Sequence, residues 1–119
     1  MNIERLTSGL SYVGEATGKR RTYDIFRGAR HYVVMSVSPT KRNAGNFTVV
    51  DADAVASVAR RFAGRKGVTT REVATAFRRG RNPIEPLAGL NILYVLVAEG
   101  RARIDTRRKD RQLYFNVGG

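Results

Sequence analysis

The sequence contains no cysteine, no tryptophan and only one histidine, His31. Without cysteine the chain has no disulfide framework, no thiol nucleophile and no thiolate metal site. A single histidine disfavours a histidine-rich metal site, and His31 is most simply a cross-strand partner of Phe26. We therefore expect no catalytic residues, no metal and no cofactor, in a protein that is not an enzyme.

Long apolar segments are also missing. No apolar run reaches about 18 residues, the length that predicts a membrane-spanning helix. The first 13 residues carry Glu4 and lack an apolar stretch of signal-peptide length. We expect a cytoplasmic protein of prokaryotic type with no membrane partner, and association with the nucleoid is one option.

Acidic residues are scarce relative to basic ones. The chain has 22 Lys and Arg against 10 Asp and Glu, which gives a net charge of +12. Such a protein attracts polyanions, and the release of counterions from a phosphate backbone strengthens that attraction. Most of the cations are arginine, which suits bidentate contacts to phosphate and to guanine. The composition therefore predicts a nucleic-acid partner.

The length of 119 residues fits one compact unit. Near Asp51 the spacing of apolar residues changes from the alternation typical of strands to the intervals typical of helices. Residues 1–50 predict a β-rich N-terminal subdomain, whereas residues 51–119 predict a largely helical one. In the first part, residues 23–27 and 30–37 are rich in β-branched and aromatic side chains, which favours strands. Gly28 and Ala29 predict a two-residue hairpin turn that places Arg27 opposite Arg30 and Phe26 opposite His31.

Three further segments complete this sheet region. Residues 47–50 predict a third strand, and residues 10–13 are a candidate for another one. The basic segment 17–21 is typical of a turn. We therefore expect a small antiparallel sheet, built from a hairpin and at least one more strand.

Helical spacing dominates the second part. Asp51 is a good N-cap for a helix that reaches about Gly64, with apolar residues at helical intervals. Thr69 followed by Glu72 forms a capping box, which predicts a second helix over about residues 70–78. Asn82 before Pro83 predicts the start of a third helix, which ends at Gly100.

Near the end of the chain, apolar and polar residues alternate again. Residues 101–105 and 112–117 predict a hairpin, and its tip (106–110) is mostly basic. Helix, short helix, helix and hairpin in this order resemble the winged helix-turn-helix DNA-binding superfamily over about residues 52–117. The resemblance rests on this order, on residues 69–74 (TTREVA) and on residues 98–100 (AEG). It implies that the third helix lies in the major groove and that the hairpin, the wing, contacts the backbone or the minor groove.

The third helix departs from the usual pattern because it is apolar on most sides. Apart from the hydroxyl of Tyr94, its only polar side chain between Glu85 and Glu99 is Asn91. A helix that is apolar all round is buried, so we expect it to pack against the N-terminal sheet or against a twin helix in a dimer. Contacts to bases or phosphates then fall to residues 78–82 at the preceding turn.

These features predict an α+β fold, with a small N-terminal antiparallel sheet packed against a winged helix-turn-helix-like unit of three helices and a hairpin. The hypothesis is a non-enzymatic double-stranded DNA-binding protein, either a transcriptional regulator or a DNA-associated accessory protein. It would hold the phosphate backbone with an arginine-rich face and a basic wing. The residues expected to contact DNA are Arg60, Arg61, Arg65, Lys66, Arg71, Arg78, Arg79, Arg81, Asn82, Arg107, Arg108, Lys109 and Arg111.

Three alternatives stay open. An RNA-binding or ribonucleoprotein accessory module would stack bases on sheet aromatics, namely Tyr23, Phe26, Tyr32 and Phe47. A protein–protein adaptor would use the apolar third helix, and a homodimer would form through residues 84–97 or through the sheet. A metal-dependent nuclease would use Asp51 and Asp53, although these carboxylates are more simply an N-cap and a complement to the helix dipole.

Overall fold

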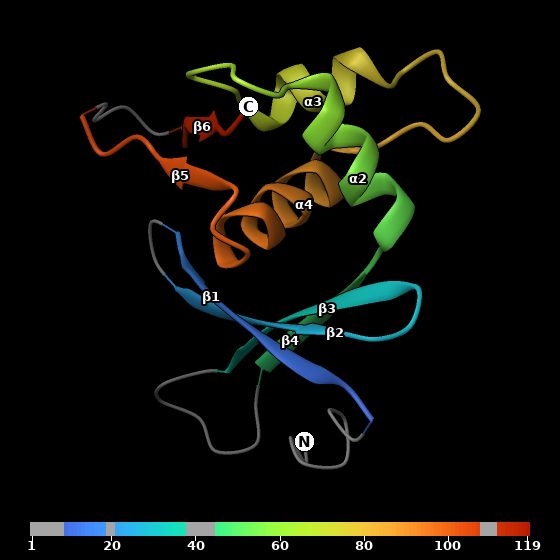
Figure 1. Ribbon diagram of the computed structural model, residues 1–119, viewed down its shortest axis with the longest axis vertical. Coiled ribbons are helices and arrows are strands. Elements are labelled where there is room, and N and C mark those ends of the chain that lie inside the picture. Colours follow the sequence, from blue (N-terminus) through green and yellow to red (C-terminus); the bar gives the residue numbers. More distant parts are fainter. Residues whose placement is uncertain (1–8, 19–20, 38–44, 108–111) are drawn as a thin grey trace.

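The computed structural model describes residues 9–18, 21–37, 45–107 and 112–119. Its fold is α+β, as predicted, with a four-stranded antiparallel sheet, a two-stranded sheet and three helices. The elements are β1 (Ser11–Thr17), β2 (Thr22–Arg27), β3 (His31–Val37), β4 (Gly45–Asp51), α2 (Ala52–Arg61), α3 (Thr70–Ala76), α4 (Pro86–Ala98), β5 (Ala102–Ile104) and β6 (Phe115–Val117). Figure 1 shows α4 between the four-stranded sheet on one side and α2 and α3 on the other.

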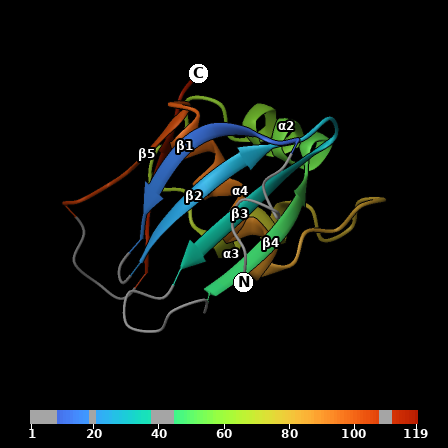
Figure 2. The same ribbon diagram turned by 90° about the horizontal axis from the view of Figure 1, so that it is seen from below.

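The four-stranded sheet has the order β1-β2-β3-β4, and Figure 2 shows it as one layer with the helices behind it. The predicted hairpin exists, but its predicted register is wrong by two residues. Arg27 pairs with Tyr32 and Phe26 pairs with Val33. The turn is centred on Ala29 and Arg30, because the amide of Gly28 donates to the carbonyl of His31 at 2.8 Å.

A steric reason explains this register. The His31 ring lies against Gly28, and a Cβ at position 28 would stand 2.5 Å from that ring. Gly28 is therefore the cross-strand partner that makes room for an imidazole, and it is not the centre of the turn. The other two predicted strands are confirmed but are longer than expected, since β1 covers Ser11–Thr17 and β4 covers Gly45–Asp51.

The two faces of the sheet differ in what they carry. The face toward α4 carries core residues that include Ile25, Tyr32 and Val34. On the opposite face, the outer face, Tyr12, Phe26, Val33 and Val49 follow one another in register across the strands, and Asp24, Met35 and Phe47 form a neighbouring row. Two of the four aromatics proposed as a stacking surface, Tyr23 and Tyr32, thus belong to the inner face, and that part of the hypothesis is wrong.

Helices α2 and α3 begin as the sequence predicts. The carboxylate of Asp51 accepts a hydrogen bond from the amide of Asp53 at 3.1 Å, and Thr69 Oγ1 accepts one from the amide of Glu72 at 3.1 Å. Both helices end two to three residues earlier than expected, at Arg61 and at Ala76. Their apolar stripes are buried as the spacing predicts.

The predicted start of the third helix is wrong. Helix α4 begins at Pro86, and Glu85 is its N-cap, with extended backbone angles (φ −74°, ψ 156°). A proline disfavours helical angles at the residue before it, so Pro86 keeps Glu85 out of the helix. Asn82 and Pro83 therefore precede the helix without capping it. The predicted glycine stop is confirmed, because Gly100 has φ +75° just after the helix.

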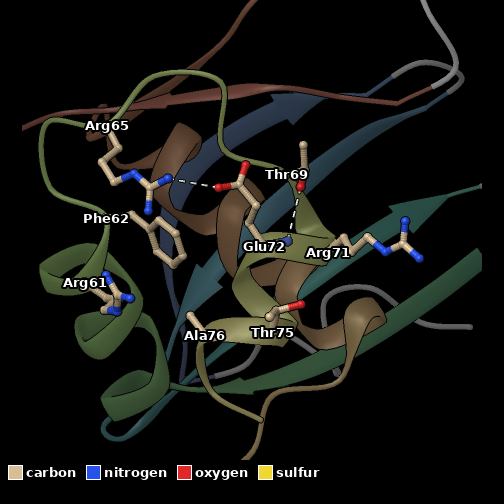
Figure 3. Close-up of a pocket in the computed structure, with 8 residues that line it drawn as sticks. All are labelled: Arg61, Phe62, Arg65, Thr69, Arg71, Glu72, Thr75 and Ala76. Atoms are coloured by element: carbon tan, nitrogen blue, oxygen red, sulfur yellow. Dashed lines mark hydrogen bonds and ion pairs between the residues drawn. The ribbon is translucent and has the colours of Figure 1, made fainter.

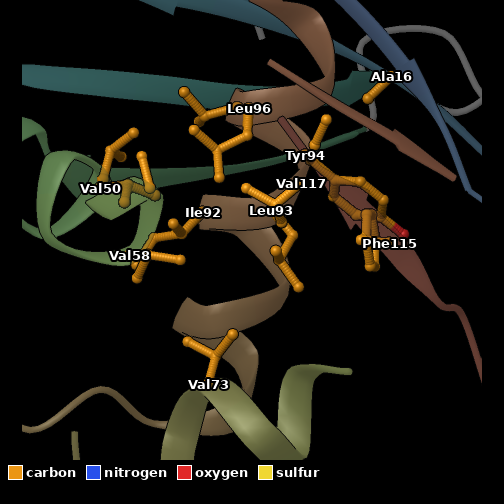
Figure 4. Packing of buried hydrophobic residues seen from close by; sticks show 14 of the residues in the cluster. Ala16, Val50, Val58, Val73, Ile92, Leu93, Tyr94, Leu96, Phe115 and Val117 are labelled. Carbon is orange, nitrogen blue, oxygen red and sulfur yellow. The ribbon is translucent and has the colours of Figure 1, made fainter. Parts of the chain in front are cut away.

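Helix α4 is the centre of the core. It contacts α2, α3, β5 and all four strands of the sheet, and residues 91–96 are all buried. Figure 4 shows its side chains meeting Val50 and Val58 on one side, Phe115 on another and Val73 near its start. Of the two arrangements expected for this apolar helix, the structure shows packing against the chain's own sheet. Residues 91–96 are therefore covered within the chain, whereas Leu87 is 67% exposed, and a dimer or an adaptor surface through residues 84–97 stays a prediction.

The C-terminal hairpin closes the helical part. Strand β5 pairs with β6, and Val68 bridges to Phe115, with its amide donating to the Phe115 carbonyl at 2.8 Å. Phe115 and Val117 are buried, so these two side chains of β6 face the core. The order of helices and hairpin is as expected, and membership of the winged helix-turn-helix superfamily stays a prediction.

A polar network also ties the sheet to α4. Arg27 donates to the hydroxyl of Tyr32, which donates to Glu99 Oε2 at 2.8 Å, and Arg101 lies 3.5 Å from the other oxygen of Glu99. Burial and the hydrogen bond to Glu99 raise the pKa of Tyr32. The network holds the end of α4 against β2 and β3.

Candidate functional site

The segment from residue 60 to residue 81 carries eight cations and one acid, Glu72. We call these eight cations the basic face: Arg60, Arg61, Arg65, Lys66, Arg71, Arg78, Arg79 and Arg81. All eight are exposed. They come from the end of α2, the loop after it, α3 and the turn after α3. Figure 1 shows α3 and the segments beside it on the side of α4 away from the four-stranded sheet.

Three of the basic-face arginines line one groove. Arg61, Arg65 and Arg71 border a hollow of about 330 Å³ between α2 and α3, together with Phe62, Thr69, Glu72, Thr75 and Ala76. Figure 3 shows Arg65 directed at Glu72 across this groove, with Arg61 on the same side as Arg65 and the guanidinium of Arg71 extending away from both. The nitrogen of Arg65 and the oxygen of Glu72 are 3.0 Å apart.

An aromatic ring organises two of these arginines. The guanidinium carbons of Arg61 and Arg65 lie 5.6 and 5.1 Å from the centroid of the Phe62 ring. Phe62 is 1% exposed, so the ring is fixed by the core. Contacts of this kind between a cation and a ring face are attractive, and they hold both guanidinium groups at one wall of the groove.

Two other basic-face residues, Arg81 and Arg60, border other hollows. Arg81 and Asn82 border a separate hollow that also contains Asp51 and Asp53. Arg60 borders a third hollow with Arg101, next to Gly118 and Gly119. The structure therefore brings Arg61 and Arg65 together at one wall of the groove, while Arg71 extends away from them and Arg60, Arg81 and Asn82 border other hollows.

The hairpin tip is described only in part. Arg107 forms an ion pair and hydrogen bonds with Asp105, the shortest at 3.1 Å between side chains, and these raise the pKa of Arg107. This arginine is thus partly neutralised within the hairpin. The other predicted wing residues, Arg108, Lys109 and Arg111, lie outside the described residues.

Sequence reasoning missed two exposed arginines at the start of the hairpin, Arg101 and Arg103. The signal was available, because alternation in β5 places Ala102 toward the core and its neighbours toward solvent. Arg101 borders the same hollow as Arg60, and its guanidinium lies 3.5 Å from Glu99.

The carboxylates Asp51 and Asp53 act locally. Asp51 caps α2 through the amide of Asp53, which is the simpler of the two roles expected for this pair. Within the described ranges, no group of three acidic, histidine or cysteine side chains is placed to hold a metal ion. In the same part of the chain, no helix combines the length and the apolar character that crossing a membrane requires.

No protein-family model, curated protein or solved structure matches this chain. Its function must therefore be argued from the site itself, and the strongest feature of that site is the charge on the helical side.

Proposed function

We propose that this chain is a non-enzymatic double-stranded DNA-binding protein that holds the phosphate backbone with its basic face. The observation that carries the proposal is the exposure of all eight cations between residues 60 and 81, beside one acid. Clustered arginine and lysine on one side of a fold is the usual electrostatic footprint of such proteins. Transcriptional regulation and an accessory role on DNA both fit this activity.

The order α2, α3, α4, β5, β6 and the bridge from Val68 to the hairpin support the likeness to a winged helix-turn-helix unit. The docking mode proposed here differs from the one that this likeness implies. Residues 91–96 of α4 are buried under the sheet, so the body of this helix has no surface to place in a major groove. Contact instead falls to α3 and the segments on either side of it, where the arginines come mostly from a helix end and connecting turns and not from one helix that could lie in a groove. We therefore propose binding that depends mainly on phosphate contacts.

Fluorescence anisotropy with a random-sequence duplex at several salt concentrations tests this proposal. The logarithm of affinity falls against the logarithm of salt by about 0.9 per phosphate contact, so about five to eight contacts give a slope near −4.5 to −7. No binding of duplex DNA at low salt would refute the proposal.

A pair of charge-matched variants tests the surface. Replacing Arg78 and Arg79 with Ala removes two exposed cations beside α3, whereas replacing Arg21 and Arg30 removes two exposed cations at the ends of sheet strands. We expect the first variant to lose more affinity and to flatten the salt slope by about 1.8. An equal loss in both variants would show that only net charge matters and that the basic face is not the interface.

A second candidate function is RNA binding by the outer face of the sheet. Tyr12 and Phe47 are 57% and 52% exposed there, and exposed aromatics on a sheet stack unpaired bases. It ranks second because Glu15 and Asp24 share that face, and carboxylates repel a phosphate backbone. Competition between single-stranded RNA and duplex DNA for the same protein separates the two candidates.

A further inference from the structure

We propose that the groove between α2 and α3 binds a single phosphate group of the nucleic-acid backbone, and that Glu72 occupies this site as a competing anion in the free protein. The inference rests on the proposed function and adds to it the place where one phosphate sits and the residue that sets how tightly it is held.

The groove combines two arginines with open space beside them. Arg61 and Arg65 stand at one wall, held over the same fixed Phe62 ring at 5.6 and 5.1 Å. Their planar guanidinium groups suit bidentate contact with the two free oxygens of a phosphodiester. The hollow of about 330 Å³ beside them is also lined by Thr75. The groove therefore offers a phosphate group both positive charge and enough room.

Arg65 already contacts an anionic group in this groove. Its partner is the oxygen of Glu72 at 3.0 Å, and the two side chains are 49% and 40% exposed. An ion pair this open to solvent is weak, so an incoming phosphate that also meets Arg61 can displace the carboxylate. Figure 3 shows Arg65 turned toward Glu72, which is the arrangement expected of a groove occupied by its own anion.

The side chain of Glu72 does not supply the hydrogen bond that caps α3. The hydrogen bond that caps this helix runs from the amide of residue 72 to Thr69 Oγ1, and it uses the backbone of residue 72. A neutral glutamine therefore leaves the cap in place while it frees Arg65. Glu72 is also the one acid among the cations of residues 60–81.

The test compares Glu72→Gln with Glu15→Gln. Both changes remove one negative charge from an incompletely buried side chain, but Glu15 lies on β1 and belongs to the outer face of the sheet. The probe is a fluorescein-labelled random 20-base-pair duplex, measured by anisotropy at fixed salt, with thermal melting to confirm that both variants are folded. We expect Glu72→Gln to bind about threefold tighter than the wild-type chain, as expected for removing one nearby like charge in a well-solvated site, and Glu15→Gln to change affinity less.

A second readout reports on the groove directly. We expect the Arg65 Nε–H resonance to shift on titration with inorganic phosphate, and to shift at lower phosphate concentration in Glu72→Gln. If the wild-type chain binds duplex DNA but the two variants bind equally and Arg65 does not respond, this inference is overturned and the proposed function stands. If the wild-type chain binds no duplex at low salt, the proposed function is overturned and the inference falls with it.

Discussion

The buried phenol of Tyr94 predicts a loss of stability at high pH. Tyr94 is 3% exposed, its ring stacks on Tyr23 with centroids 4.7 Å apart, and it meets the edge of Phe115 at 6.1 Å. It therefore lies where the sheet, α4 and the hairpin meet. Burial, with a smaller contribution from Tyr23, raises the pKa of Tyr94 from 10.0 to about 12.

The direction of the pH effect follows from the difference in proton binding between the folded and the unfolded chain. Between pH 10 and pH 12 the unfolded chain has lost the phenolic proton while the folded chain retains it, so the free energy of unfolding falls as pH rises. The stabilisation that the protonated phenol contributes is fully present below pH 10, which is the pKa of Tyr94 in the unfolded chain. It is lost as pH rises through the pKa of the folded chain, about 12. For a shift of this size the loss is about 1.4 kcal/mol at pH 11 and approaches about 2.7 kcal/mol above pH 12.

Urea unfolding of the wild-type chain and of Tyr94→Phe at pH 8 and pH 11 measures this effect. Phenylalanine keeps the ring and removes the ionisable group, so the difference at pH 8 reports only the lost hydroxyl. Between pH 8 and pH 11, we expect the free energy of unfolding of the wild-type chain to fall by about 1.4 kcal/mol more than that of the variant. Equal losses in both proteins would show that Tyr94 ionises as freely in the folded state as in the unfolded one, and the reasoning about its burial would be wrong.

Two further predictions concern how the elements are joined. Gly14 has φ +157°, and a Cβ there would stand 2.8 Å from the backbone carbonyl oxygen of Ala98. We expect Gly14→Ala to lower the free energy of unfolding by about 2–4 kcal/mol, whereas Gly80→Ala, where the nearest atom is 3.8 Å away, changes it little. Similar effects of both changes in urea melts would contradict the close approach of β1 to α4. Thr69→Ala removes the side-chain cap of α3 and is expected to cost about 1 kcal/mol, with Thr69→Ser as the variant that restores stability.

The burial of α4 is the feature with the widest consequence for function. Helix order alone implies that this helix faces DNA, yet it packs against all four strands of the sheet. Residues 91–96 of this helix are therefore not accessible to a binding partner. What is left exposed is α3, which offers Arg71 and short side chains such as Thr75, with arginines on either side.

Local signals in the sequence predicted most of the secondary structure. The caps at Asp51 and Thr69 and the stop at Gly100 were all identified correctly, since each depends on residues within a few positions of one another. The sequence also contains the signal for the start of α4, because Pro86 disfavours helical backbone angles at Glu85. Asn82 and Pro83 gave a competing signal for an earlier start.

By itself, then, the sequence determined the fold class, the order of the elements and the excess of arginine between residues 60 and 81. Only the tertiary structure decided the hairpin register, the face on which Tyr23 and Tyr32 lie, and the grouping of Arg61 and Arg65 around Phe62 while Arg60 and Arg81 lie elsewhere. The physical reason is the distance along the chain between the residues that interact. Capping and helical spacing act between neighbours along the chain, whereas register, burial and the meeting of side chains are set by packing between segments that are far apart in the sequence.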